Sequence, residues 1–420
     1  MRQFWSADVD DPGGRGDVTE TAPSRSEEIL TPDFYHYPWA VPSTVRVDGR
    51  FVELDWPDGL RLRAFDLWLA ENTIGRAIDP TTRESVLDPA DLPDDLTVAT
   101  AELIDGGAVA VTWSGSGQRT VAPALFHPGW LRHVAEGAHR PAAGLPEPVP
   151  WLATDLGAPP TRDGAAIASD DELLVAWLGD LARYGLARLT GAGTDPDLLL
   201  GIGARIGAIR DTNFGPIWDV RASVEPNSTA NTTVRLCPHT DLPTRETPPG
   251  FQILHCLVNT AAGGWSTMTD GLALVGHLAT EHPEHHEALT TLRWVFFNRG
   301  PAVDHRWSGP LIDGGDDRPL TIRAFHPVRG FPDCDEADQP RAYDALRCFA
   351  RLAADPRFQL RYPFTPGDIV GFDNRRVLHG RDGYDADGGG HRHLRGIYLD
   401  HDEILSRLRQ ASRRSASPSR

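Results

Sequence analysis

The sequence is poor in cysteine and has no long hydrophobic run. Its 420 residues include four cysteines, none of them in a CxxC pair: Cys237, Cys256, Cys334 and Cys348. This spacing excludes a disulfide framework, and no role beyond packing is assigned to the thiols. No apolar run is long enough to span a bilayer, and the N-terminus lacks a hydrophobic signal core. We therefore expect a cytoplasmic protein with no membrane partner.

Positive charge is also scarce. The chain has 59 acidic and 41 basic residues, a formal net charge of −18. A nucleic acid is therefore excluded as a partner, because its phosphates would be repelled. The acidity mildly favours cationic or zwitterionic small molecules as ligands. Arginine outnumbers lysine, and alanine, glycine and proline are abundant, which is typical of GC-rich bacterial genes.

Composition divides the chain into five segments, and its length favours two domains. Residues 1–27 are polar without periodicity, and we expect a flexible arm. Short alternating runs between Asp-Gly turns predict a small β-rich N-terminal domain over residues 44–140. Residues 141–168 are proline-rich and are interpreted as a linker. Residues 169–410 form the predicted larger domain, and residues 411–420 a disordered tail.

The larger domain combines strands and helices. Apolar residues at helical spacing predict helices that begin near Ser169, Asp195, Asp270 and Gln339. Short apolar runs predict strands over Leu186–Leu189, Phe251–Val258, Ile369–Phe372 and Leu394–Leu399. Many short strands with turn signals, and helices mainly at the front and on one flank, predict a mainly β double-stranded β-helix, or jelly roll.

A histidine and a carboxylate lie two residues apart in Pro238-His239-Thr240-Asp241. On an extended segment such residues point to the same side. A second histidine, His379, lies far downstream, at a separation natural for strands that meet across a barrel. Two histidines and one carboxylate are the ligand set of non-haem Fe(II) oxygenases. Arg392 follows one turn and a return strand later, where a guanidinium can hold a dicarboxylate through two hydrogen bonds. These residues predict an oxygenase that depends on iron and 2-oxoglutarate.

Such a pair can also arise by chance, because the chain has 16 histidines. Context favours the metal interpretation, since the turn at Pro366–Asp368 and a short apolar strand lead directly to His379. His255 has no carboxylate at the same spacing and is interpreted as a core histidine. The histidine-rich run His282–Glu287 contains a proline and acidic residues, so we interpret it as a polar surface turn rather than a second metal site.

Several blocks of sequence resemble the γ-butyrobetaine and trimethyllysine dioxygenases, within the taurine dioxygenase superfamily. The first two blocks are His239-Thr240-Asp241-Leu242-Pro243 and Pro248-Pro249-Gly250-Phe251-Gln252-Ile253-Leu254-His255-Cys256. The last is Phe372-Asp373-Asn374-Arg375-Arg376-Val377-Leu378-His379-Gly380-Arg381, followed by Arg392 and Tyr398. Matches in the N-terminal domain extend the resemblance over most of the chain.

The resemblance implies roles for individual residues. It implies that His239, Asp241 and His379 bind Fe(II). It also implies that 2-oxoglutarate chelates the metal and pairs with Arg392. Further cosubstrate contacts are implied near Leu254 and Ser266, with O₂ as co-substrate and ascorbate as reductant.

Two departures from the family pattern concern zinc and the substrate. Relatives bind a structural zinc through cysteines in the N-terminal domain, but Trp68–Arg76 has none, so no structural zinc is predicted. γ-Butyrobetaine enzymes enclose a trimethylammonium group in aromatic faces. Aromatic residues occupy three of those positions, namely Phe214, Trp218 and Tyr398. The other two positions hold Asn231 and Leu242. These five are the candidate substrate contacts, although the aromatics could equally just pack the cavity wall.

The predicted function is hydroxylation of an unactivated C–H bond of a small polar, amino-acid-like or zwitterionic metabolite. The enzyme would be a bacterial biosynthetic tailoring dioxygenase that converts 2-oxoglutarate to succinate. Alternatives are a true γ-butyrobetaine hydroxylase of carnitine synthesis, or a desaturase or cyclase that uses the same oxidant. A jelly-roll metal-binding protein without redox chemistry and an inactive interaction protein are two further hypotheses. A homodimer is left open, and Asn298–Gly315 is the predicted lid.

Overall fold

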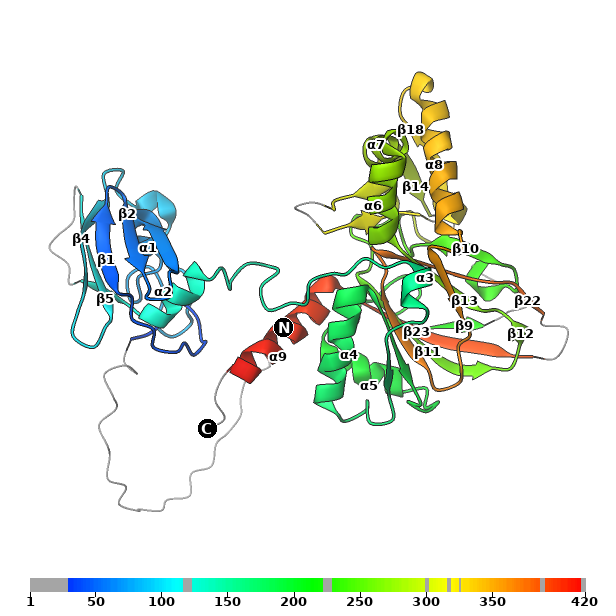
Figure 1. The fold of residues 1–420 in the computed structure, drawn as a ribbon, viewed down its shortest axis with the longest axis horizontal. Coiled ribbons are helices and arrows are strands. Elements are labelled where there is room, and N and C mark those ends of the chain that lie inside the picture. Colours follow the sequence, from blue (N-terminus) through cyan, green and yellow to red (C-terminus); the bar gives the residue numbers. More distant parts are fainter. Residues whose placement is uncertain are drawn as a thin grey trace, which may run out of the picture. The chain divides into compact units, whose positions relative to one another are not determined.

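A computed structural model of the chain describes residues 29–115, 123–221, 229–298, 302–315, 319–324, 326–385 and 390–416. The chain divides into two compact units, Met1–Ala143 and Gly144–Arg420, and each is described by itself. The predicted flexible arm, residues 1–27, lies outside the described residues. Figure 1 labels the helices and strands of both units.

The first unit holds two antiparallel sheets of three strands. One contains β1 (Thr44–Asp48), β2 (Phe51–Asp55) and β3 (Arg61–Phe65), and the other β4 (Thr97–Leu103), β5 (Val109–Ser114) and β6 (Ala124–Phe126). Helices α1 (Asp66–Glu71) and α2 (Pro128–Ala135) complete the unit. Its core is aliphatic and aromatic, and Trp68 stacks on Trp130 with ring centroids 5.3 Å apart. The predicted β-rich N-terminal fold is confirmed.

The second unit is built on two sheets that form a jelly roll. The larger has six strands in the order β7 (Thr161–Asp163), β8 (Leu186–Thr190), β20 (Ile369–Asp373), β11 (Phe251–Asn259), β23 (Arg392–Leu399) and β9 (Trp218–Arg221). The smaller has four, in the order β10 (Leu236–His239), β21 (Val377–Arg381), β13 (Ser266–Asp270) and β19 (Gln359–Tyr362). Every pair is antiparallel except β7 with β8. The predicted jelly-roll fold is confirmed.

Side chains that alternate along the strands of the larger sheet contribute to two different hydrophobic cores. In β11, Ile253 packs with the helices outside the larger sheet, whereas Leu254 and Cys256 pack between the sheets. In β23, Ile397 and Leu394 divide in the same way. Because side chains alternate with a period of two, the inner face of each strand can carry site residues while its outer face is covered.

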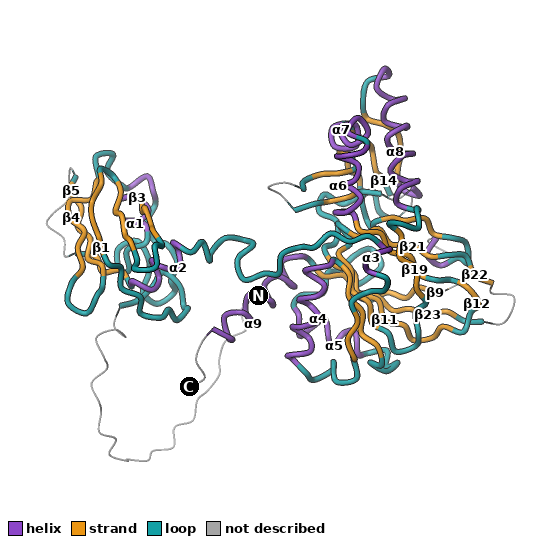
Figure 2. The backbone as a smooth tube through the Cα atoms, viewed as in Figure 1, coloured by secondary structure: helices purple, strands orange, loops and turns teal. Residues whose placement is uncertain are grey.

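Three helices cover the outer face of the larger sheet: α4 (Asp171–Tyr184), α5 (Leu198–Ile206) and α9 (His401–Ala416). Asp170 caps α4 by accepting a hydrogen bond from the amide of Leu173, and Gly185 ends the helix in the left-handed conformation. Figure 2 shows α4 and α5 beside the strands of this unit.

A second group of helices packs around a three-stranded sheet. The strands are β14 (Arg293–Phe297), β15 (Arg306–Pro310) and β18 (Arg329–Asp333), with β14 central. The helices are α6 (Gly271–Glu281), α7 (Pro283–Thr291) and α8 (Gln339–Ala353), which stand together in Figure 1. Shorter elements are α3 (Ala153–Leu156) and the strand pairs β12 (Ala262–Gly263) with β22 (Tyr384–Asp385), and β16 (Ile312–Asp313) with β17 (Thr321–Ile322).

Some boundaries differ from the predictions. Residues 141–168 are not a linker throughout, because from Gly144 onward they belong to the second unit and contain α3 and β7. The tail begins later than residue 411, since α9 continues to Ala416. The run His282–Glu287 is not a turn: Pro283 starts α7, where its missing N–H costs no helical hydrogen bond.

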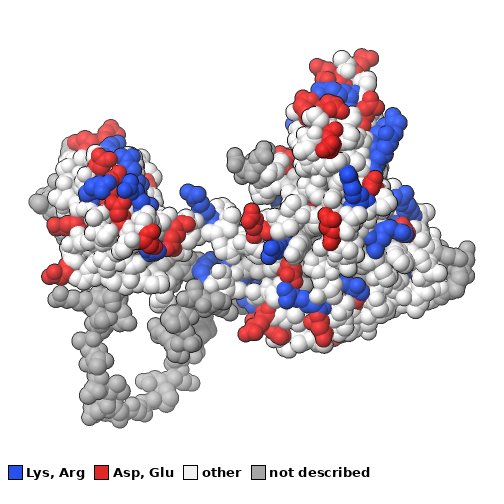
Figure 3. Space-filling view, viewed as in Figure 1, with Lys and Arg blue, Asp and Glu red and all other residues white. Residues whose placement is uncertain are grey.

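Charge is spread over the surface. On the face shown in Figure 3, arginine and acidic side chains are interspersed in both units. No helix among the described residues is both long and apolar enough to cross a membrane.

Candidate active site

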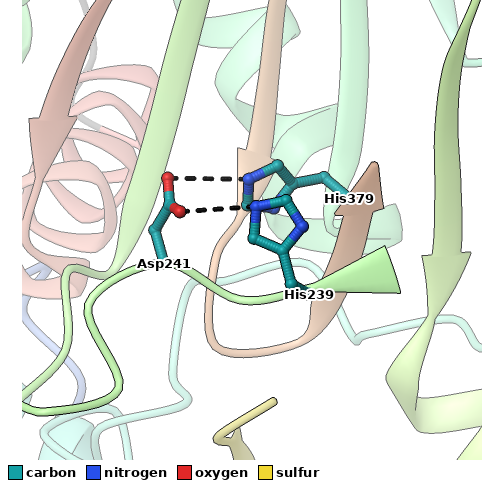
Figure 4. Close-up of side chains that lie close together, drawn as sticks. All are labelled: His239, Asp241 and His379. Atoms are coloured by element: carbon teal, nitrogen blue, oxygen red, sulfur yellow. Dashed lines mark ion pairs between the residues drawn. The ribbon is translucent and has the colours of Figure 1, made fainter. Parts of the chain in front are cut away.

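Three of the predicted site residues lie close together at one end of the smaller sheet: His239, Asp241 and His379. His239 Nε2 lies 3.6 Å from Asp241 Oδ1, and His379 Nε2 lies 3.5 Å from Asp241 Oδ2. Their ligand atoms all lie within 4.8 Å of one another. Figure 4 shows both imidazoles directed at the carboxylate. The described residues hold no second metal-type group of histidine, cysteine or carboxylate side chains.

Strand pairing sets the two histidines side by side. β10 pairs with β21 so that His239 is opposite His379, and the rings lie 4.2 Å apart between centroids. Phe372 from the larger sheet packs on the ring of His379, with centroids 4.6 Å apart. Both imidazoles are therefore held by backbone register and by packing.

Asp241 follows the end of β10 and is fixed through its backbone. Its N–H donates to Asn374 Oδ1 at 2.7 Å, and Asn374 Nδ2 donates back to its carbonyl at 3.1 Å. Thr240 is anchored on the other side, where its hydroxyl donates to the carbonyl of Ile322. Leu242 then adopts a positive φ of 53°, which is uncommon for a branched residue. The chain thus turns sharply right after the carboxylate.

The protonation states suit metal binding. Desolvation opposes ionisation of Asp241, but His379 and His239 outweigh it and hold the pKa of the carboxyl well below its usual range. Burial and the neighbouring His239 lower the pKa of His379. His239 Nδ1 lies 2.8 Å from the carbonyl of Cys237, so that nitrogen is the donor and Nε2 keeps its lone pair. The donor set fits Fe(II), which non-haem oxygenases bind through two histidines and a carboxylate.

Tyr398 and Trp218 form one wall beside Asp241. The Tyr398 hydroxyl donates to Asp241 Oδ2 at 2.8 Å, and its ring lies 5.1 Å from that of Trp218. Burial and the carboxylate of Asp241 raise the pKa of Tyr398 well above its usual value. Gly396 is required here, because a Cβ would come within 2.5 Å of the indole of Trp218. Gln252, opposite Tyr398 in the register, is buried, and its Oε1 has no hydrogen-bond partner in the part of the chain that the structure describes.

Arg392 is a buried cation on the same inner face of β23. Among the described residues its Nε has no hydrogen-bond partner and no carboxylate forms an ion pair with it. Burial, and then the charge of Arg381, lower its pKa to about 10. A buried guanidinium without a counter-charge fits an anionic ligand such as the far carboxylate of 2-oxoglutarate.

The remaining candidate residues differ in burial and in location. Leu254 and Ser266 are buried, on the larger and the smaller sheet respectively. Phe214 is 42% exposed. Asn231 lies in the segment preceding β10, and Arg381 holds that segment by donating to the carbonyls of Ala230, Thr232 and Val234.

Part of the predicted lid is regular structure. Residues 299–301 lie outside the described residues, but Arg306–Pro310 forms β15 and pairs with β14. Trp307 packs against the outer core, with the guanidinium of Arg323 4.4 Å from its ring. Because β15 is held by strand pairing and by packing, this part of the predicted lid is not a hinged loop.

Asn374, Gln252 and the hydroxyl contact of Tyr398 were not identified as functional from sequence. The available signal in the sequence is an asparagine just after an apolar strand, in Asp373-Asn374. Sequence patterns place such an amide in a turn but do not say which distant backbone it contacts.

Comparison with known proteins identifies relatives of this chain. Residues 148–398 match the model of the family described as taurine catabolism dioxygenase TauD, TfdA family. The chain is 37% identical over 364 residues to a γ-butyrobetaine dioxygenase of Pseudomonas sp. (strain AK-1), covering 85% of this chain and 92% of that protein. It is 35% identical over 258 residues to the human γ-butyrobetaine dioxygenase, covering 60% of this chain and 66% of that protein.

A crystal structure of an asparagine oxygenase in complex with Fe(II), hydroxyasparagine and succinate is also similar. Its TM-score is 0.45 at 17% identity, over 55% of this chain and 78% of that chain.

The chain belongs to the TauD, TfdA family of dioxygenases. Within it, the curated relatives of this chain include γ-butyrobetaine and trimethyllysine dioxygenases, as the sequence motifs predicted. It is an iron- and 2-oxoglutarate-dependent dioxygenase.

Proposed function

We propose that this dioxygenase hydroxylates an unactivated C–H bond of a small polar metabolite, amino-acid-like or zwitterionic, as a bacterial biosynthetic tailoring enzyme. His239, Asp241 and His379 would hold Fe(II), and Arg392 would bind 2-oxoglutarate, with Leu254 and Ser266 nearby. The observation that carries the proposal is the convergence of these three ligand atoms. It is joined by a buried Arg392 on the inner face of β23, which forms no ion pair with a carboxylate among the described residues. Iron and 2-oxoglutarate supply, in this enzyme class, the oxidation of a C–H bond coupled to decarboxylation of the 2-oxo acid to succinate.

The protein's own residues would bind the metal and the 2-oxo acid and orient both. Tyr398 holds the carboxylate of Asp241, Asn374 holds the backbone of Asp241, and the carbonyl of Cys237 holds the ring of His239. Little reorganisation is therefore needed when the metal binds. The guanidinium of Arg392 fixes one end of the 2-oxo acid. Phe372 and the aliphatic residues between the sheets exclude water from the inner face.

The wall beside Asp241 supports a substrate with a cationic or polar group. Trp218 and Tyr398 present two aromatic faces, which attract an ammonium group. Gln252 offers a buried amide without a partner for its oxygen, which a substrate N–H or O–H could satisfy. A partly polar wall of this kind favours a small zwitterion over a purely apolar substrate.

The test is turnover with substrate candidates. Purified protein with Fe(II), ascorbate and 2-oxoglutarate should release succinate in proportion to a product 16 Da heavier than one member of an amino-acid and betaine panel. His239→Ala and Asp241→Ala should abolish both products, while His282→Ala at the N-cap of α7 should not. Full turnover in either triad variant would refute the assignment, and a product lighter by two hydrogens would instead indicate a desaturase or cyclase.

A second candidate substrate is γ-butyrobetaine itself. It is favoured by the 37% identity to a γ-butyrobetaine dioxygenase over 92% of that relative. The non-aromatic residues at Asn231 and Leu242 count against it, because fewer aromatic faces enclose a quaternary ammonium. Incubation with γ-butyrobetaine and detection of carnitine decides between the two.

A further inference from the structure

A second pocket lies in the same unit, between the edge strand β10 and helix α8. Its volume is about 300 Å³, at the lower end of the range for small-molecule sites. Cys237 and Pro238 line it from β10, and Leu346, Phe349 and Ala350 line it from α8. The pocket therefore has an apolar floor beside the strand that carries His239.

This pocket is separate from the triad. Leu346 and Phe349 belong to the core cluster outside the smaller sheet, together with Leu378. Leu378 and His379 are consecutive in β21 and so face opposite sides of the sheet. Leu346 and Phe349 therefore line the pocket from the Leu378 side, whereas Cys237 and Pro238 line it from the segment that leads to His239. None of the proposed iron or 2-oxoglutarate residues lines it.

The charged side chains around the pocket are basic. Arg235, Arg329 and Arg351 line it together with His326, and no aspartate or glutamate among the described residues does. Arg329 is half-buried with its guanidinium 5.0 Å from the ring of Trp294. Desolvation, and then the charge of Arg329, lower the pKa of His326, which agrees with a positive local potential. This is unusual in a chain of net charge −18.

We propose that the pocket is a second binding site, for a small amphipathic carboxylate. Its alkyl part would lie on Leu346, Phe349 and Ala350, where it removes apolar surface from water. Its carboxylate would face the guanidinium groups of Arg329 and Arg351, which accommodate such a group through charge-assisted hydrogen bonds. This proposal goes beyond the oxygenase function and needs no turnover to be tested.

The probe is octanoate, titrated calorimetrically into the full-length protein without iron or 2-oxoglutarate. Octanol and octylammonium, of equal chain length, isolate the contributions of the apolar tail and of the charge. Octanoate should bind at least ten times more tightly than either. Arg329→Gln and Arg351→Gln should each weaken octanoate about tenfold, equal to about 1.4 kcal/mol. Ala350→Phe should block binding by filling the pocket.

Two control variants and a competition with 2-oxoglutarate make the outcome decisive. Arg347→Gln, on the same helix but outside the pocket lining, should leave the affinity unchanged, and so should Arg392→Gln. The proposal is overturned if Arg351→Gln and Ala350→Phe bind octanoate normally, or if octylammonium binds equally well. It is also overturned if 2-oxoglutarate displaces the probe or Arg392→Gln abolishes binding, because the probe would then occupy the cosubstrate cavity. If Arg329→Gln unfolds the protein, Arg351 and Ala350, both on α8, still decide the question.

Discussion

The hydroxyl of Tyr398 donates a hydrogen bond to Asp241 Oδ2 across 2.8 Å, between residues 157 positions apart in the sequence. Tyr398 comes from β23 in the larger sheet, whereas Asp241 follows β10 in the smaller one. The bond therefore joins the two sheets at the proposed iron site. Among the described residues Oδ1 accepts no hydrogen bond from a hydroxyl, so this oxygen would be available to hold the metal.

Replacing Tyr398 by phenylalanine should weaken Fe(II) binding by about tenfold, since groups that orient a metal ligand typically contribute that much or more. The aromatic wall is kept, so the stability of the metal-free protein should change little. Anaerobic calorimetry with Fe(II) measures the affinity, and thermal unfolding of the apoprotein measures the stability.

Tyr362→Phe is the matched control for this prediction. Tyr362 is also buried between the sheets, but its hydroxyl has no hydrogen-bond partner among the residues described. Equal iron affinities for the two variants would show that the contact between Tyr398 and Asp241 does not orient the carboxylate.

Much of the site could be predicted from the period of the strands. His239 and Asp241 share one side of an extended segment, and the donor types then restrict the chemistry to a small set of metals. What the pattern does not contain is the partner of each polar group across the fold. The contacts of Asp241 with Tyr398 and Asn374 depend on sheet topology, which no local spacing specifies.

Proline caused the main errors in predicting the fold. The prolines of residues 141–168 indicated a linker, yet Pro159 and Pro160 only precede β7, an edge strand, where a missing N–H is tolerated. Pro283 suggested a turn but occupies the first position of α7. In each case the position of proline within an element decides its effect, and composition alone does not give that position.

Asn374→Ala should destabilise the protein by about 2–4 kcal/mol. The fully buried side-chain amide makes three hydrogen bonds, to the N–H and carbonyl of Asp241 and to the carbonyl of Pro249, and each buried group left without a partner costs about 1–3 kcal/mol. Iron affinity should fall as well, because the backbone of Asp241 loses its anchor. Urea unfolding of the apoprotein and calorimetry test the two effects.

Asn72→Ala, in the first unit, is the control for Asn374→Ala. Its amide donates to the carbonyl of Trp68, so the substitution can lower the stability of that unit but should leave iron affinity intact. A variant of Asn374 with normal iron affinity would show that the turn after β10 holds its geometry without the amide.

Arg392→Gln should reduce the affinity for 2-oxoglutarate by roughly thirtyfold or more, since removing one partner of a buried charge pair costs about 2–5 kcal/mol. The metal-free protein should be equally stable or more stable, because the variant lacks a buried cation without a counter-charge. Calorimetry with Mn(II)-loaded protein measures the first effect, and urea unfolding the second.

Arg395→Gln separates the position from the charge. Arg395 lies three residues along the same strand and faces the other side, where it pairs with Asp219. It should leave the affinity for 2-oxoglutarate unchanged. Equal losses in both variants would contradict a specific role for Arg392.

The stability of the second unit should fall as the pH is lowered through the ordinary range of histidine, and His255 should contribute to that fall. Burial lowers the pKa of this fully buried imidazole, even though the carbonyl of Gly193 accepts a hydrogen bond from its Nε2 at 2.8 Å. The unfolded chain therefore binds a proton below pH of about 6.5 that the folded chain does not take up. The stabilisation is complete above that pH and is lost below it.

His255→Gln keeps a donor for Gly193 without a titrating group, so its unfolding free energy should differ less between pH 7.5 and pH 5.5. An unchanged pH dependence in urea unfolding would exclude His255 as a contributor.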